Sequence, residues 1–265
     1  AQRDRPPYHT ATAFLLAGTK KVIITARKSG GEQGIDQAVR KLNQIPGVAG
    51  PAVGIQANAA NTEEIAKLVD EVRKSDGKLD ILVANAGATW RGPFEPTPDW
   101  SSQKILDLNV HPIPLLEAAG TSQDPSRVII VSSVAGVNVP HVGENGTIMY
   151  LVSKAVANHL VRNFAVELGN ITTNAVAPGF FPSKLANGLI ENLGGRDKLS
   201  SEVPHGRVGE PEDIAGVMIY LCSPAANYIN GVDIAVDGGR RLGIGSSEAV
   251  VETCVHHPAH ILANA

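Results

Sequence analysis

A tyrosine and a lysine stand four residues apart in the run Tyr150-Leu-Val-Ser-Lys154, and Ser133 follows the strand-like run 127–132 upstream. If residues 149–168 form a helix, Tyr150 and Lys154 share one face, because residues four apart are neighbours on a helix. A free tyrosine has a pKa of about 10, and a nearby ammonium lowers that pKa by favouring the phenolate. The pair therefore predicts proton transfer to or from an oxygen atom. The alternative is a half-buried tyrosine beside a solvated lysine.

Short runs of Val, Ile and Leu alternate with longer amphipathic stretches along the chain. This alternation is typical of βαβ units and predicts an α/β fold with a parallel sheet. We expect Thr62 to cap one helix and Pro211 to lie in the first turn of another. The predicted strands are residues 21–26, 52–57, 79–84, 127–132, 171–177 and 232–236, and the predicted helices are 32–43, 62–75, 149–168 and 211–222.

The composition favours a cytoplasmic protein that acts on a small molecule. The 265 residues, 43% apolar and 18% charged, predict a single domain over residues 1–265 with an irregular segment at 1–9. A net charge of -3 leaves no broad basic surface, so neither nucleic acid nor a membrane is a predicted partner. No apolar run approaches the roughly 20 residues of a membrane-spanning helix. The two cysteines are too few for a disulfide framework, and no metal site is predicted.

Five motifs occur in the order found in one family of oxidoreductases. Over about residues 12–242 the chain resembles the short-chain dehydrogenase/reductases, in particular those that reduce 3-oxoacyl groups on acyl carrier protein or act in rhamnolipid biosynthesis. This resemblance implies a Rossmann-like, doubly wound parallel sheet in three α/β/α layers. The motifs are Asn85-Ala86-Gly87, Asn109, Ser133, the pair Tyr150 and Lys154, and Pro178-Gly179 followed by Ser183.

The resemblance also implies roles for four catalytic residues. Tyr150 would give or take a proton while a hydride moves to or from a nicotinamide, and Lys154 would lower its pKa. Ser133 would donate a hydrogen bond to the oxygen of a carbonyl or alcohol substrate. Asn109 would hold the water that links Lys154 to solvent.

A second group of residues is expected to contact NADP(H). Arg27 ends the predicted strand 21–26, where an arginine pairs with the 2′-phosphate of NADP and an acid would select NAD; the alternative is a solvated pair with Lys28. Asn58 lies where the family often has an Asp facing the adenine. The further expected contacts, each of which could instead be an ordinary turn or helix cap, are Asn85, Ala86, Gly87, Pro178, Gly179 and Ser183.

The glycine-rich turn that holds the pyrophosphate in this family is not found in the sequence. Residues 10–18 resemble only the second half of the first helix, so the first strand of the sheet is expected to be missing or replaced. Three outcomes are open: the sheet closes up, another chain donates a strand, or the atypical tail 243–265 enters through residues 249–255. Pro112 and Pro114 also shorten the crossover that commonly forms the dimer interface, so a homo-oligomer is allowed but not required.

Two functions therefore remain open. The first is an NADP(H)-dependent reductase or dehydrogenase acting on a 3-oxoacyl group or a similar ketone. The second is a non-catalytic, truncated or alternatively spliced relative that cannot hold the dinucleotide. Substrate contacts are expected from about residues 88–98, 136–146 and 181–205, with Phe180, Phe181 and Leu185 as an apolar lid or as packing residues.

Overall fold

A computed structural model describes residues 6–32, 34–59, 61–86, 114–139, 147–183 and 186–243. Gly87, Asn109, Leu185, the tail 244–265 and the expected substrate loop 88–98 lie outside the described residues. None of the helices in the described ranges is long and apolar enough to cross a membrane.

All six predicted strands are present, with ends within two residues of the predicted ones. The four predicted helices are confirmed, and two short helices, α6 and α7, lie in the region 181–205 that was expected to form substrate loops. The strands are β1 (Val22–Ala26), β2 (Ala52–Gln56), β3 (Ile81–Ala84), β4 (Ser126–Val131), β5 (Ile171–Pro178) and β6 (Asp233–Val236). The helices are α1 (Pro6–Leu16), α2 (Ile35–Asn43), α3 (Thr62–Asp76), α5 (Ile148–Glu167), α6 (Asn187–Asn192), α7 (Gly195–Ser201) and α8 (Pro211–Leu221).

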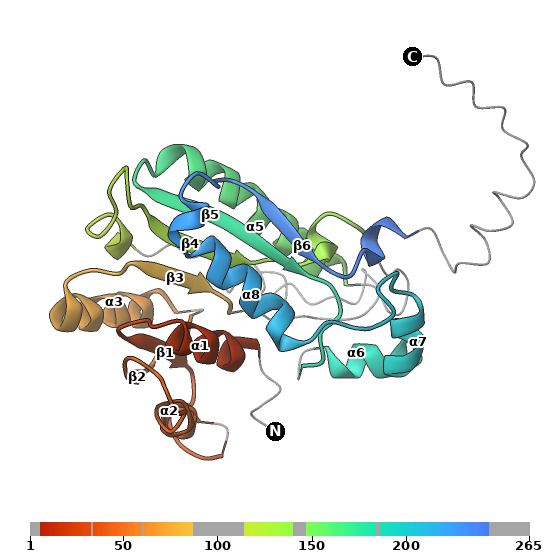
Figure 1. The fold of residues 1–265 in the computed structure, drawn as a ribbon, viewed down its shortest axis with the longest axis horizontal. Coiled ribbons are helices and arrows are strands. Elements are labelled where there is room, and N and C mark those ends of the chain that lie inside the picture. Colours follow the sequence, from red (N-terminus) through yellow and green to blue (C-terminus); the bar gives the residue numbers. More distant parts are fainter. Residues whose placement is uncertain are drawn as a thin grey trace, which may run out of the picture.

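The strands form two separate parallel sheets (Figure 1). One contains β1 and β2, and the other contains β3, β4, β5 and β6 in that order. Among the described residues no strand joins β1 to β3, so the expected gap in the doubly wound sheet is confirmed.

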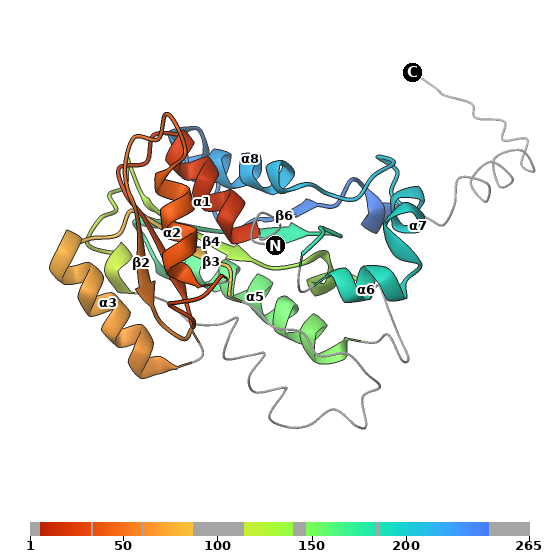
Figure 2. The same ribbon diagram turned by 90° about the horizontal axis from the view of Figure 1, so that it is seen from below.

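Helices cover both faces of the strands, as expected for three α/β/α layers (Figure 2). On one face, Phe14 of α1 and Met218 of α8 pack with Ile129 and Val176 of the larger sheet. On the other face, Ala157 and Val161 of α5 pack with further residues of β4 and β5. Every residue of β5 except its last is buried, which makes β5 the centre of the core. The carboxyl ends of β4 and β5 are therefore held rigidly against α5.

Two helix starts differ from the prediction. Asn61, not Thr62, is the N-cap of α3, and its side-chain oxygen accepts hydrogen bonds from the N–H groups of Glu63 and Glu64 at 2.9 and 3.1 Å. The sequence permitted either residue as the cap, since both side chains carry an acceptor oxygen. Helix α1 begins at Pro6, so residues 6–9 are not irregular; prolines are tolerated in a first turn, where no intrahelical N–H bond is lost.

The start of α8 is confirmed and has an additional stabilising feature. Pro211 lies in the first turn, and Glu210 and Asp213 form a reciprocal capping box. The N–H of Glu210 donates to the Asp213 carboxylate at 2.7 Å. Asp213 also accepts two hydrogen bonds from the Arg207 guanidinium, at 2.7 and 2.8 Å. These bonds hold the pKa of Asp213 down at about 2, with the bond to Arg207 as the main cause.

Candidate active site

The predicted pair lies in the first two turns of α5, on the side that faces the larger sheet. Lys154 is 4% exposed, and its ammonium donates a hydrogen bond of 2.8 Å to the carbonyl of Val131 at the end of β4. The same ammonium lies 5.5 Å from the centre of the half-buried Tyr150 ring. The main chain of α5 is tied to the same strand end, because the Ser132 hydroxyl donates to the carbonyl of Lys154 at 3.2 Å. The helix and the strand thus fix both side chains.

Ser133 completes the cluster from the end of β4. It caps a short 3-10 helix, η2 (Val134–Gly136), by accepting a hydrogen bond from the N–H of Ala135 at 3.2 Å. Its hydroxyl is also hydrogen-bonded to the phenol of Tyr150 and lies 3.5 Å from the carbonyl oxygen of Pro178, at the end of β5. The fold therefore brings Ser133, Tyr150 and Lys154 together at one edge of the sheet.

Burial controls the protonation of Tyr150. Removal from water raises the pKa of Tyr150 above its ordinary 10.0, and the hydrogen bond with Ser133 offsets only part of that rise. In this structure the desolvation of the phenolate therefore outweighs any lowering of the Tyr150 pKa that was expected from Lys154. Tyr150 keeps its proton at neutral pH, which suits a proton donor.

Burial acts on Lys154 in the opposite direction. It lowers the pKa of the ammonium from 10.5 to about 8, because a charged amine loses its hydration in the contact between α5 and β4. At neutral pH the side chain is mostly charged, yet it needs only a small change of pH or surroundings to lose its proton. A group with this property can pass a proton toward the tyrosine.

The turn after β5 lies beside the cluster. The N–H of Gly179 donates to the carbonyl of Val236 at 2.9 Å, and a Cβ atom at Gly179 would lie 2.7 Å from the Cβ of Asp237. Only glycine allows this approach of the β5 and β6 ends. The hydroxyl of Ser183 accepts a hydrogen bond from the N–H of Ala186 at 3.1 Å. Ser183 therefore takes part in the turn before α6, the structural alternative that the sequence left open for it.

The expected adenosine contacts lie at the carboxyl ends of β1, β2 and β3. Arg27 is exposed after β1, and its carbonyl accepts a 2.9 Å bond from the Gln56 side chain. Asn58 follows β2, and its N–H donates to the carboxylate of Glu64 at 2.8 Å. Asn85 and Ala86 follow β3 and remain at least partly exposed. Because parallel strands end at a common edge, these residues and the Tyr150 cluster lie at the same side of the molecule.

The described residues suit the nicotinamide and the adenosine ribose of a dinucleotide better than the pyrophosphate between them. Ser133, Tyr150, Lys154 and the turn at Gly179 suit the reactive ring, and Arg27 suits a phosphorylated ribose. A pyrophosphate is usually held by backbone N–H groups at a helix start that follows a strand. In the ranges that the structure describes, no strand precedes α1 to form such a turn.

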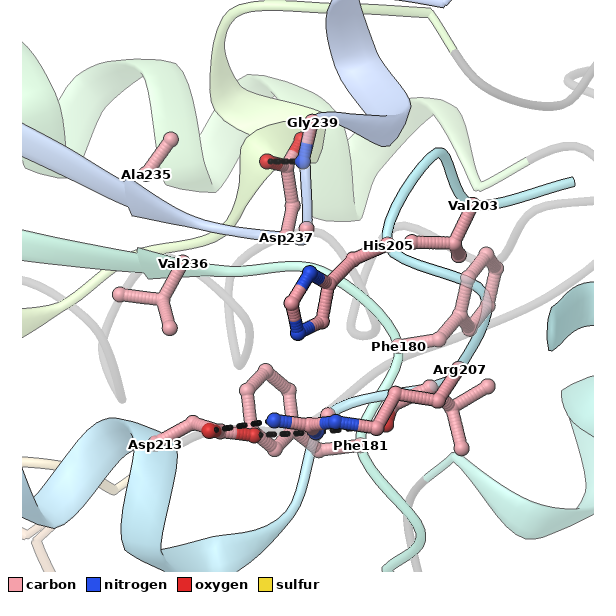
Figure 3. A pocket seen from close by; sticks show the side chains of 13 residues that line it. Phe180, Phe181, Val203, His205, Arg207, Asp213, Ala235, Val236, Asp237 and Gly239 are labelled. Atoms are coloured by element: carbon pink, nitrogen blue, oxygen red, sulfur yellow. Dashed lines mark hydrogen bonds and ion pairs between the residues drawn. The ribbon is translucent and has the colours of Figure 1, made fainter.

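A cavity of about 380 Å³ lies beyond the ends of β5 and β6 (Figure 3). Phe180, Phe181 and Val236 supply apolar walls of this cavity. The His205 ring lies between Asp237 and the ion pair that Arg207 forms with Asp213. Phe181 is 6% exposed and belongs to the core, which makes it a packing residue. His205 lies at the end of the region 181–205 from which substrate contacts were expected. The sequence did not indicate Asp237, because it belongs to no motif and the cavity joins segments distant along the chain.

Comparisons with known proteins give matches over most of the chain. The family model described as Enoyl-(Acyl carrier protein) reductase matches residues 8–241. The chain is 32% identical to the rhamnolipids biosynthesis 3-oxoacyl-(acyl-carrier-protein) reductase of Pseudomonas aeruginosa, over 86% of this chain and 89% of that protein. It is 30% identical to the 5-keto-D-gluconate 5-reductase of Escherichia coli, over 78% and 81% of the two chains.

A solved structure supports the same likeness. The active-site complex of RhlG with NADP from Pseudomonas aeruginosa superposes with a TM-score of 0.78 and 30% identity, over 89% of this chain and 92% of that one. The likeness therefore extends over the whole length of the fold and is not confined to the Tyr150 cluster.

Proposed function

Because the chain belongs to the short-chain dehydrogenase/reductase family of oxidoreductases, we propose that it transfers a hydride between NADP(H) and a ketone or secondary alcohol, with Tyr150 as the general acid and base. One observation carries this proposal: the half-buried Tyr150 is hydrogen-bonded to Ser133, and its ring centre lies 5.5 Å from the ammonium of Lys154.

The chain's own residues handle the substrate oxygen and its proton. In the reductive direction, the Ser133 hydroxyl donates a hydrogen bond to the carbonyl oxygen and polarises it. Tyr150 then donates its proton to that oxygen as negative charge develops there. The nicotinamide, when bound, supplies the hydride. Lys154 returns a proton toward Tyr150, and Asn109 is proposed to connect Lys154 with solvent.

The preference for NADP(H) rests on Arg27. An exposed guanidinium after β1 can form charge-assisted hydrogen bonds with a 2′-phosphate. The similar RhlG structure is a complex with NADP, which supports the same cofactor for this chain. The other residues proposed to hold the dinucleotide are Asn58, Asn85, Ala86, Gly87, Pro178, Gly179 and Ser183.

The proposed substrate is a 3-oxoacyl group or a similar ketone. Two similar proteins are named as reductases of a 3-oxoacyl group and of a keto-gluconate. Both substrates present a carbonyl carbon to a hydride donor. The chemistry at Tyr150 is common to both, so the class of reaction is supported more directly than the identity of the rest of the substrate.

A titration of NADPH followed by its fluorescence tests the cofactor, and a substitution tests the chemistry. We expect saturable NADPH binding in the micromolar range. We expect Tyr150→Phe to lower the reduction of acetoacetyl-coenzyme A by roughly 10²- to 10⁴-fold, with NADPH affinity unchanged. Tyr228→Phe is the control, since Tyr228 is fully exposed. No binding at millimolar NADPH would instead indicate a non-catalytic relative, and activity that survives Tyr150→Phe would refute the role of Tyr150.

A further inference from the structure

Ser132 links the end of β4 to α5 from a buried position between the two elements. It is 3% exposed, and its N–H donates to the carbonyl of Val176 in β5 at 2.8 Å. Its hydroxyl donates to the carbonyl of Lys154 at 3.2 Å. The main chain of Ser132 is thus fixed by the sheet, while its side chain reaches the helix that carries Tyr150 and Lys154.

The bond from Ser132 adds to the regular hydrogen bonds of α5. In an α-helix the carbonyl of residue 154 accepts from the N–H of residue 158. A carbonyl oxygen has two lone pairs, so it can accept from a second donor as well. The Ser132 hydroxyl is that second donor, and it fastens the turn of α5 at Lys154 to the strand end without disturbing the helix.

Gly136 brings η2 into close contact with the same turn of α5. A Cβ atom at Gly136 would lie 2.9 Å from the carbonyl carbon and 3.0 Å from the carbonyl oxygen of Lys154. Both atoms belong to the helix backbone, which cannot move aside as the end of a long side chain can. The φ angle of Gly136 does not lie in the left-handed region. The position therefore requires the small size of glycine and not its conformational freedom.

The contact between η2 and α5 exists although it buries an amide. Asn158 lies one turn after Lys154 and is 2% exposed. Within the described ranges its side-chain amide has no hydrogen-bond partner, and the amide nitrogen lies 2.9 Å from the position of a Gly136 Cβ. A buried amide without a partner opposes packing. Asn158 thus weakens the contact, and the bond from Ser132 acts against this effect.

The same contact decides how the catalytic side chains lie. Ser133 stands between Ser132 and η2, so a movement of this segment away from α5 would carry the Ser133 hydroxyl away from Tyr150. The Lys154 ammonium donates at 2.8 Å to the carbonyl of Val131, the residue before Ser132. A gap between α5 and this strand end would therefore admit water to the ammonium.

We propose that Ser132 and Gly136 are positioning residues, which hold α5 against the end of β4 and so keep Ser133 beside Tyr150 and the Lys154 ammonium away from water. Neither residue acts on the substrate itself. Their effect on turnover rests on the proposed hydride-transfer reaction, whereas their effect on the surroundings of Lys154 is a property of the fold.

The titration of Lys154 tests this role without any turnover. In the unmodified protein, burial lowers the pKa of the ammonium from 10.5 to about 8. Ser132→Ala and Gly136→Ala should each move this pKa back toward 10.5, because water reaches the ammonium when α5 separates from β4. The measurement is nuclear magnetic resonance of the full chain with carbon-13-labelled lysine, and Lys154→Met assigns the signal.

Ser153→Ala is the matched control. Ser153 is a fully buried serine of α5, and its hydroxyl donates to the carbonyl of Tyr150 at 2.8 Å. Ser153→Ala removes a similar bond to the main chain of a catalytic residue, but that bond lies within one helix. It should leave the pKa of Lys154 at about 8. Ser132→Thr, which keeps the hydroxyl, should do the same.

The turnover rate provides the second test. In the reduction of acetoacetyl-coenzyme A, Ser132→Ala should lower kcat by roughly 10- to 100-fold, the order expected when reacting groups are misplaced by about 1 Å. The KM for NADPH should stay unchanged, because the expected adenosine contacts lie on other strands. Ser153→Ala and Ser132→Thr should retain most of the wild-type activity.

The outcomes separate the positioning role from the proposed reaction. A Lys154 pKa that stays at about 8 in Ser132→Ala or Gly136→Ala would overturn the role of the residue that was changed, and an equal rise in Ser153→Ala would overturn the whole proposal. If Gly136→Ala does not fold, Ser132→Ala decides. A protein that binds no NADPH would refute the proposed reaction, yet the titration of Lys154 would still support or overturn the positioning role.

Discussion

The protonation of Tyr150 and Lys154 is set by where the two side chains lie. Burial raises the pKa of Tyr150 and lowers the pKa of Lys154 to about 8. Both shifts favour the neutral form of the side chain, which is the general effect of desolvation. The protein thus holds a neutral acid next to an amine that can give up its charge. This combination suits reduction of a carbonyl at neutral pH.

The lowered pKa of Lys154 predicts how stability changes with pH. The unfolded chain binds more protons than the folded one between pH 8 and 10.5, so the free energy of unfolding should rise with pH across this window. Below about pH 8 the buried, charged ammonium of Lys154 destabilises the folded protein by its full amount, which is on the order of 3 kcal/mol. Lys154→Met removes this titration. Urea unfolding at a series of pH values should show that the wild-type protein gains stability relative to Lys154→Met between pH 8 and 10.5. If the free energies of unfolding of both proteins change equally with pH, the prediction is wrong.

Arg27 is expected to set the cofactor preference. Arg27→Ala should raise the dissociation constant of NADPH by about 10- to 100-fold, the range for lost charge-assisted hydrogen bonds, and leave that of NADH nearly unchanged. Arg40→Ala is a matched control, because Arg40 is an exposed arginine on α2. An equal loss for NADPH and NADH would show that Arg27 does not contact a 2′-phosphate.

At the scale of elements, the ends of the helices decide the position of the site. Helix α5 presents Tyr150 and Lys154 from its first turns, and η2 presents Ser133 from the end of β4. The helices α3 and α8 are anchored by side-chain caps at Asn61 and Glu210. Such caps satisfy N–H groups that a helix start otherwise leaves unpaired.

The cap of α3 can be tested with two adjacent substitutions. Asn61→Ala should lower the free energy of unfolding by about 1 kcal/mol, because the N–H groups of Glu63 and Glu64 lose their acceptor. Thr62→Ala should have a much smaller effect, since Thr62 is the first helical residue and exposed. Chemical denaturation of both variants shows which of the two residues caps α3. A larger loss of stability for Thr62→Ala than for Asn61→Ala would mean that Thr62 is the cap.

At the scale of the whole molecule, the divided sheet is the main departure from a continuous doubly wound fold. The smaller sheet, β1 and β2, has no backbone bonds to β3 among the described strands. In the described part of the chain, side-chain packing joins it to the larger sheet through the cluster that Val22 shares with Ile81 and Val83. A unit held in this way should open more readily than the core around β4 and β5.

Native-state hydrogen exchange should resolve the two sheets. We expect the hydrogen-bonded amides of β1 and β2 to exchange earlier than those of β4 and β5, because the smaller sheet can open without unfolding the larger one. Among the described strands, β6 is likewise bonded to one neighbour only, so its amides should exchange at a rate between those of the two groups. Mass spectrometry of peptides that cover each strand is the measurement. Equal exchange in both sheets would mean that the molecule opens only as one unit.

Local pattern was sufficient to predict the helices and strands. The six strands were predictable because each is a short apolar run, and α5 because its apolar residues recur at helical spacing. Ser133, Tyr150 and Lys154 were predicted as site residues from the ordered motifs by which the chain resembles the short-chain dehydrogenase/reductases, and the structure places the three side chains together. The gap between β1 and β3 was also predicted, since the glycine-rich turn is not found and residues 10–18 resemble only the second half of the family's first helix.

Only the tertiary structure decided the properties that depend on distant neighbours. The raised pKa of Tyr150 comes from burial, which no local pattern reports. The choice of Asn61 over Thr62 as a cap depends on backbone geometry. The cavity at His205 joins the ends of β5 and β6 to the loop before α8. Spacing along a chain determines which side chains can meet on one element, whereas protonation and burial depend on packing between elements far apart in sequence.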